Sequence, residues 1–158
     1  MQEKVMEALK NQGFKLEKEG EMGYSFEYES LGLLYLPSEN DDTFLNLAVP
    51  SIWEGDGEQV AEAYAVVNQI NASLKYVKAC MLGSRMWLFY ERELLDNEDL
   101  EEIVAHMVVR LAVAVGNAHK AVHEHFGGPD CGNGDRDDEN ADREVPGDVE
   151  DNEDNNEE

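Results

Sequence analysis

Hydrophobic and polar residues follow two different spacings along the first half of the chain. Val5, Met6 and Leu9 recur three to four positions apart, which predicts a short amphipathic helix that stops near Gly13. Apolar residues then alternate with polar ones, as in half-buried strands. The strand-like segments cover residues 14–17, 24–28, 31–36 and 44–49, the last two ending at prolines.

The second half repeats the helix and strand spacings in a new order. Helical spacing over residues 58–72 predicts a second helix. Residues 74–82 and 86–94 read as two strands joined by a hairpin at Gly83-Ser84. A final helix is expected to begin near Asp96 or Asn97, because Asp96 and Asp99 resemble a capping box.

The order is therefore helix, three or four strands, helix, two strands, helix. It predicts an α+β fold, with an antiparallel sheet and helices packed on one face. We expect a single domain over residues 1–127. Beyond it, residues 128–158 contain only two aliphatic side chains larger than alanine, Val145 and Val149, which predicts a disordered acidic tail.

Charge narrows the possible partners. The formal net charge is −24, from 36 acidic and 12 basic residues. Residues 130–158 alone hold 14 acidic and 2 basic residues. Nucleic acid and anionic membranes are therefore not expected as partners.

The sequence has no long apolar run and no signal-peptide pattern after Met1, so we expect a cytoplasmic protein. Its cysteines, Cys80 and Cys131, are expected to be reduced.

Particular residues within this order of elements resemble the YbjN family of bacterial proteins, whose fold is like that of type III secretion chaperones. They are the strand closing at Val49-Pro50, the helix with Val66-Val67-Asn68-Gln69-Ile70-Asn71, the strands 75–82 and 86–91, and the long helix from Glu98. The resemblance covers residues 1–125. It implies a homodimeric, non-enzymatic domain that binds a protein segment or has a regulatory role, with no catalytic residues to carry over.

The final helix is apolar around most of its circumference. Between Ile103 and Val115, only His106 and Arg110 are polar. A surface helix needs only one apolar stripe, so a second copy of the chain is expected to cover the rest. The predicted contact residues are Val108, Ala112 and Val115. The alternative is that the other helices of the same chain cover this surface.

A few polar residues could in principle carry chemistry. His119 and His123 lie one helical turn apart with His125 nearby, a spacing that could chelate a metal with Glu124 or Cys131. Histidines also suit a helix C-terminus electrostatically, so no metal or other cofactor is predicted.

The acidic residues around the second helix have a similar structural explanation. Glu54, Asp56 and Glu58 fit a solvated turn and a helix start, where negative charge is stabilising. No nucleophile motif or phosphate-binding loop is present, so the chain is not expected to be an enzyme.

Together these patterns predict a non-catalytic, chaperone-like or adaptor module that binds another protein segment and acts as a homodimer. Trp53 and Trp87 are predicted to contact the partner, with further candidate aromatic residues at Tyr24, Phe26 and Phe89. Two alternatives stay open: a small-ligand or metal-binding regulatory protein, and an acidic mimic that competes for basic proteins through its tail.

Overall fold

The computed structural model describes residues 2–95 and 97–127, and within them the chain forms helices and one antiparallel sheet. The helices are α1 (Gln2–Asn11), α2 (Gly57–Ser73) and α3 (Leu100–Phe126). The strands are β1 (Glu17–Glu19), β2 (Gly23–Tyr28), β3 (Leu31–Tyr35), β4 (Phe44–Glu54), β5 (Val77–Leu82) and β6 (Arg85–Glu93). The α+β prediction and its order of elements are confirmed. The predicted tail, residues 128–158, lies outside the described residues.

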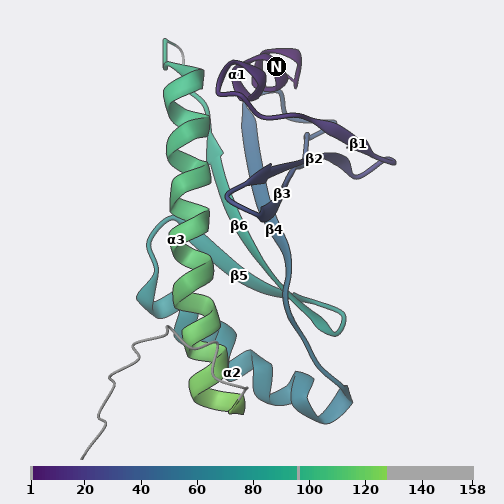
Figure 1. Ribbon diagram of the computed structural model, residues 1–158, viewed down its shortest axis with the longest axis vertical. Coiled ribbons are helices and arrows are strands. Elements are labelled where there is room, and N and C mark those ends of the chain that lie inside the picture. Colours follow the sequence, from purple (N-terminus) through teal and green to yellow (C-terminus); the bar gives the residue numbers. More distant parts are fainter. Residues whose placement is uncertain (1, 96, 128–158) are drawn as a thin grey trace, which may run out of the picture.

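The six strands have the order β1-β2-β3-β4-β6-β5, and every neighbouring pair is antiparallel. Helix α3 runs the length of the molecule against β4 and β6, with α1 near its beginning and α2 near its end (Figure 1). No helix among residues 2–95 and 97–127 has both the length and the apolar character needed to cross a bilayer.

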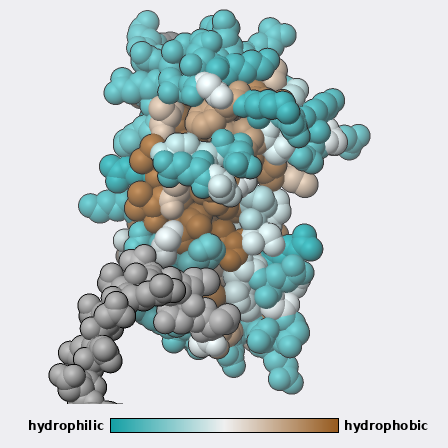
Figure 2. All heavy atoms as spheres, viewed as in Figure 1, coloured by the Kyte–Doolittle hydropathy of each residue, from teal (hydrophilic) through white to brown (hydrophobic). Residues whose placement is uncertain are grey.

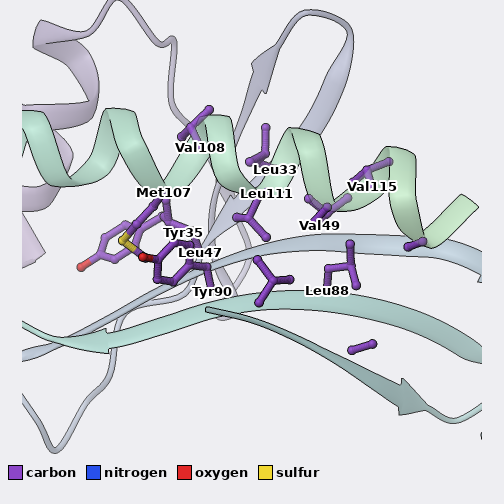
Figure 3. Packing of buried hydrophobic residues seen from close by; sticks show 14 of the residues in the cluster. Leu33, Tyr35, Leu47, Val49, Leu88, Tyr90, Met107, Val108, Leu111 and Val115 are labelled. Atoms are coloured by element: carbon purple, nitrogen blue, oxygen red, sulfur yellow. The ribbon is translucent and has the colours of Figure 1, made fainter. Parts of the chain in front are cut away.

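One hydrophobic core lies between the sheet and the three helices. From α3, Met107 and Leu111 point toward the strands, where they meet Leu47, Leu88 and Tyr90 (Figure 3). Helix α1 adds buried residues from Val5 to Leu9, and α2 adds residues from Ala63 to Ile70. All three helices therefore depend on the same face of the sheet for their burial.

The end of α1 differs from the predicted helix-to-strand transition. Gly13 has φ +91°, the N–H of Phe14 donates to the carbonyl of Leu9, and the N–H of Gly13 donates to that of Lys10. This is a Schellman motif, which turns the chain sharply and directs Phe14 back toward the core. The predicted strand over residues 14–17 is therefore wrong, and β1 begins only at Glu17.

Strand β4 continues past its predicted end at Pro50. The register against β6 shifts between Val49 and Trp53, and Ser51 has φ +51° within this bulge. A proline can lie in a strand where a bulge interrupts the hydrogen-bond ladder, because its missing N–H is not needed there.

Side-chain caps set the beginnings of the two longer helices. Asp56 caps α2 in a capping box with Gln59. Asp99 caps α3 by accepting hydrogen bonds from the N–H groups of Glu101 and Glu102. The cap predicted at Asp96 lies outside the described residues, and the described helix begins after Asp99, later than predicted.

The two edges of the sheet are protected in different ways. At the β5 edge, the Asn71 amide pairs with the backbone of Ala79: Nδ2 donates to the carbonyl over 3.1 Å, and Oδ1 accepts from the N–H over 2.7 Å. Strand β1 is short, exposed and charged throughout its length, Glu17–Glu19. Both devices discourage pairing with a strand of another chain.

Candidate functional site

The sheet face opposite the helices carries an aromatic pair. Trp87 and Phe89 of β6 are partly exposed, and their rings stack with centroids 6.0 Å apart. They alternate with Met86, Leu88 and Tyr90, which point into the core. Trp87 and Phe89 therefore lie on the opposite face, which no helix of the described chain covers. We call this surface the open face.

Two buried residues continue the row of apolar side chains next to this pair. In the sheet register, Phe89 lies opposite Ala48 of β4, and Ala48 lies opposite Leu34 of β3. Both residues are buried but do not belong to the core cluster between sheet and helices. An apolar strip thus crosses three strands of the open face, and the two partly exposed aromatic rings at its end supply its accessible contact area.

A polar group borders the apolar strip. The Lys78 ammonium and the Glu91 carboxylate form an ion pair across β5 and β6. This hydrogen bond raises the pKa of Lys78, so the Lys78 ammonium stays charged at neutral pH. Asn46 donates to the same carboxylate over 3.2 Å, while its own Oδ1 is buried without a hydrogen-bond partner. One buried acceptor beside the apolar strip therefore makes no hydrogen bond with the described residues.

The rest of the open face is mainly acidic. Alternation and register place several carboxylates on this face, at Glu17, Glu19, Glu27, Glu91 and Glu93. The described basic residues on this side are Lys78, Arg85 and Lys15, and each forms an ion pair with a glutamate. The surface therefore combines apolar contact area with excess negative charge, which favours an apolar segment flanked by basic residues.

Trp53 does not share this face with Trp87, so the prediction that grouped them needs correction. Trp53 stacks on Phe126 of α3, with ring centroids 4.8 Å apart, on the helix side of the sheet. The sequence did not reveal this position, because the bulge between Val49 and Trp53 interrupts the alternation of β4 before the chain places Trp53 against the core.

Two further aromatic candidates also belong to the core side. Phe26 is buried and packs against Phe14, with ring centroids 5.0 Å apart. Tyr24 stacks on Tyr35 at 6.3 Å. Of the predicted aromatic contacts, Trp87 and Phe89 remain as candidates for the open face.

The contact residues predicted on the final helix also need correction. Val108 and Val115 are only 1% and 8% exposed, because the chain's own core covers them. Ala112 is half-buried. The exposed apolar side chains of α3 are instead Val109 and Val113, at 46% and 59%. Helix α3 therefore does expose apolar side chains to solvent, but on the side of Val109 and Val113 and not on the predicted side of Val108 and Val115.

Tyr76, which lies beside α3 in a strained backbone conformation, was not among the residues that the sequence analysis identified. Tyr76 has φ +69°, a backbone conformation that is costly for a bulky side chain, and its residue is 64% exposed. Its ring stacks on Tyr90 and lies 5.9 Å from the Arg110 guanidinium carbon. Arg110 also donates to His106 over 3.1 Å. The expected strand from Leu74 begins only at Val77, after this turn.

The histidines near the end of α3 do not converge with other ligands in the described structure. His119 and His123 are exposed, and His125 lies 3.8 Å from a carboxylate oxygen of Glu62 on α2. Residues 2–95 and 97–127 contain no group of three or more histidine, cysteine or acidic residues placed to hold a metal ion. Cys131, the other suggested ligand, lies outside these ranges.

The acidic residues that might have carried chemistry have structural roles. Asp56 caps α2, and Glu54 pairs with Arg85 at 3.2 Å. Glu58 lies in the first turn of α2, where the helix dipole favours negative charge. The described surface has open hollows, such as one with a mainly polar lining beside Lys18 and Glu39, and one beside Ser25 and Phe26. This geometry gives no support to an enclosed small-molecule site.

Comparison with solved structures identifies the fold. YbjN from E. coli, described as a candidate transcription regulator, matches with a TM-score of 0.54 and 15% identity, over 75% of this chain and 92% of YbjN. An uncharacterized protein from Methanothermobacter thermautotrophicus matches with a TM-score of 0.54 and 14% identity, over 80% of this chain and 99% of that protein. No family model matches the chain, and no curated protein matches it.

These likenesses define the class as an α+β protein with a twisted antiparallel sheet and a long terminal helix. Within that class, the chain has a YbjN-like fold. The fold prediction from the sequence is confirmed at this level.

Proposed function

We propose that the protein is a non-catalytic protein-binding module of the adaptor or chaperone-like type, which acts as a homodimer in the bacterial cytoplasm. Its open face captures an apolar segment flanked by basic residues. The observation that carries the proposal is the stacked Trp87–Phe89 pair, at the end of an apolar strip that no described helix covers. Burial of aromatic side chains supplies much of the affinity in protein interfaces.

Charge supports a protein partner over nucleic acid. The net charge of −24 opposes a phosphate backbone and attracts basic proteins. A regulatory role, as described for YbjN, would therefore act through protein contacts in this chain.

The two tryptophans of the chain make a direct test possible. The Trp53→Phe protein keeps Trp87 on the open face, and the Trp87→Phe protein keeps Trp53 on the helix side. The probe is a synthetic peptide of alternating valine and lysine, and its control is an equally charged peptide of alternating serine and lysine. We expect the valine peptide to change the emission of Trp87 and to leave that of Trp53 unchanged.

Salt separates this proposal from the acidic-mimic alternative. Apolar capture of the valine peptide persists in about 1 M NaCl, where the Debye length is about 3 Å. Binding of both peptides with equal affinity, and its loss at high salt, would instead identify a polyanion that attracts any basic chain. A response of Trp53 alone would place the binding surface on the helix side.

A further inference from the structure

The outer side of α3 carries a stripe of six exposed residues at alternating spacings of four and three. They are Glu102, His106, Val109, Val113, Gly116 and Lys120. The alternation of four and three repeats every seven residues, as in the seam between two helices of a left-handed coiled coil. Hydrophobic residues gather over the middle of α3 in Figure 2, while both ends of the molecule are hydrophilic.

This stripe is self-complementary when it is reversed. If two copies of α3 run antiparallel and their centres meet at Leu111, the residues of the stripe face one another in pairs. These pairs are Glu102 with Lys120, His106 with Gly116, and Val109 with Val113. In an antiparallel pair of α3 helices related by a two-fold axis, each valine faces a valine of the other copy. Glu102 and Lys120 lie on opposite sides of the centre of α3, about 27 Å apart at a rise of 1.5 Å per residue. In the antiparallel pair, Glu102 of one copy therefore faces Lys120 of the other.

Among residues 2–95 and 97–127, no contact explains why position 116 is a glycine. It lies inside a 27-residue helix, where glycine costs about 1 kcal/mol relative to alanine. A Cβ added there would meet no atom within 4 Å. In the antiparallel arrangement, Gly116 faces the imidazole of His106 from the other copy, so the missing side chain provides the space that this ring needs.

We propose that a second copy of this chain covers the outer side of α3 in this antiparallel register, with Glu102 of each copy against Lys120 of the other. The inference rests on the proposed homodimer and specifies its interface. A parallel pair would instead place Glu102 against Glu102 and Lys120 against Lys120. Charge complementarity therefore selects the antiparallel arrangement.

Charge reversal tests the register in the full-length protein. Glu102→Lys gives each copy two lysines on the stripe, and Lys120→Glu gives each copy two glutamates. Each variant turns two attractive contacts into two repulsive ones, so we expect the dissociation constant to rise about tenfold in sedimentation equilibrium. An equimolar mixture of the two variants should form heterodimers, and the double variant Glu102→Lys/Lys120→Glu should dimerise like the wild type.

These rescues separate the interface from helix stability. Glu102→Lys opposes the helix dipole in the first turn of α3, and Lys120→Glu replaces the Lys120–Glu124 ion pair with two like charges. The double variant therefore has the least stable α3 of the series and should still regain the dimer. The matched control is Glu58→Lys, which makes the same charge change in the first turn of α2. It should leave dimerisation unchanged or slightly stronger, because it reduces repulsion between two acidic copies.

Two results would overturn the inference. If the wild type is a dimer but the charge-reversed chains dimerise equally well alone and in the mixture, the copies meet through another surface and the proposed homodimer survives. If the wild type stays monomeric at millimolar concentration, both the register and the homodimer are wrong. The peptide experiment on Trp87 reports on the open face in either case.

Discussion

At the scale of single residues, Asn71 shows how an exposed polar side chain can protect a sheet. It lies in the last turn of α2, and its amide makes both hydrogen bonds that an added strand would make to Ala79 of β5. The asparagine belongs to the short sequence on which the resemblance to the YbjN family partly rests. Its role in the structure is to close an edge of the sheet.

Replacing Asn71 with alanine should therefore destabilise the protein and increase aggregation. The loss of two backbone contacts should lower the free energy of unfolding by about 1–2 kcal/mol in urea titrations. Asn68→Ala is the matched control, because Asn68 is exposed in the preceding turn of the same helix. It should change stability by no more than about 0.5 kcal/mol. Equal effects of the two variants would show that helix propensity, and not the edge contact, matters at Asn71.

Glu98 gives a second prediction at this scale, which concerns pH. Its carboxylate accepts a hydrogen bond from the N–H of Leu95 and also pairs with Arg92, and these contacts lower the pKa of Glu98. A carboxyl group whose pKa falls on folding stabilises the protein above its unfolded-state pKa. This contribution is lost as the pH falls through the folded-state pKa.

Glu98→Gln should therefore be less stable than the wild type at pH 7, and the difference should shrink as the pH falls to about 3. Urea unfolding at the two pH values measures it. Glu21→Gln, at an exposed position in the turn before β2, is the control and should show no such narrowing. A stability difference for Glu98→Gln that is the same at both pH values would contradict the argument.

At the scale of elements, side-chain caps and special backbone geometries decide where helices and strands begin and end. The alternation of Phe14 and Leu16 indicated a strand, but the Schellman motif at Gly13 makes these residues a core-packed link. The proline at position 50 indicated a strand end, but the bulge lets β4 continue. Such errors arise because residue spacing records which side chains are buried and does not record the local backbone path.

The cap of α2 can be tested on its own. Asp56→Ala removes the acceptor for the N–H of Gln59, so the free energy of unfolding should fall by about 1 kcal/mol in urea titrations. Asp56→Ser keeps a capping oxygen and should recover most of this loss. If serine is no better than alanine, the capping box contributes little to stability here.

At the scale of the whole molecule, charge and core are separated along the chain. Every residue of the core cluster lies between Val5 and Phe126, whereas residues 130–158 carry 14 acidic and 2 basic side chains. The end of the sequence thus adds self-repulsion, and its composition offers little apolar side-chain area, since Val145 and Val149 are its two aliphatic residues larger than alanine.

A chain that ends at Gly127 should therefore fold and be slightly more stable than the full chain at low ionic strength. The difference should disappear in about 0.5 M salt, because screening weakens repulsion between distant exposed charges. Thermal unfolding of both chains at low and high salt measures this. A loss of more than about 1 kcal/mol on shortening the chain would show that the removed segment contributes to the stability of the fold.

The candidate site could be predicted from the sequence only in part. The aromatic alternation of β6 and the apolar excess of α3 were both visible, and the open-face pair and the outer stripe lie within them. The sequence did not show which face of β6 and which side of α3 would be buried. In β6, Trp87 and Phe89 are as bulky as Met86 and Leu88, so either set could have formed the core.

The sequence by itself therefore determined the order of helices and strands and the α+β class, because helical and strand spacings are local properties of the chain. Only the tertiary structure decided which side of each amphipathic element is buried. Once α3 packs on the face that holds Leu88, the pair Trp87–Phe89 must lie on the other face, and Val109 and Val113 must point away from the sheet. These choices depend on contacts between residues far apart in the sequence, which no local spacing contains.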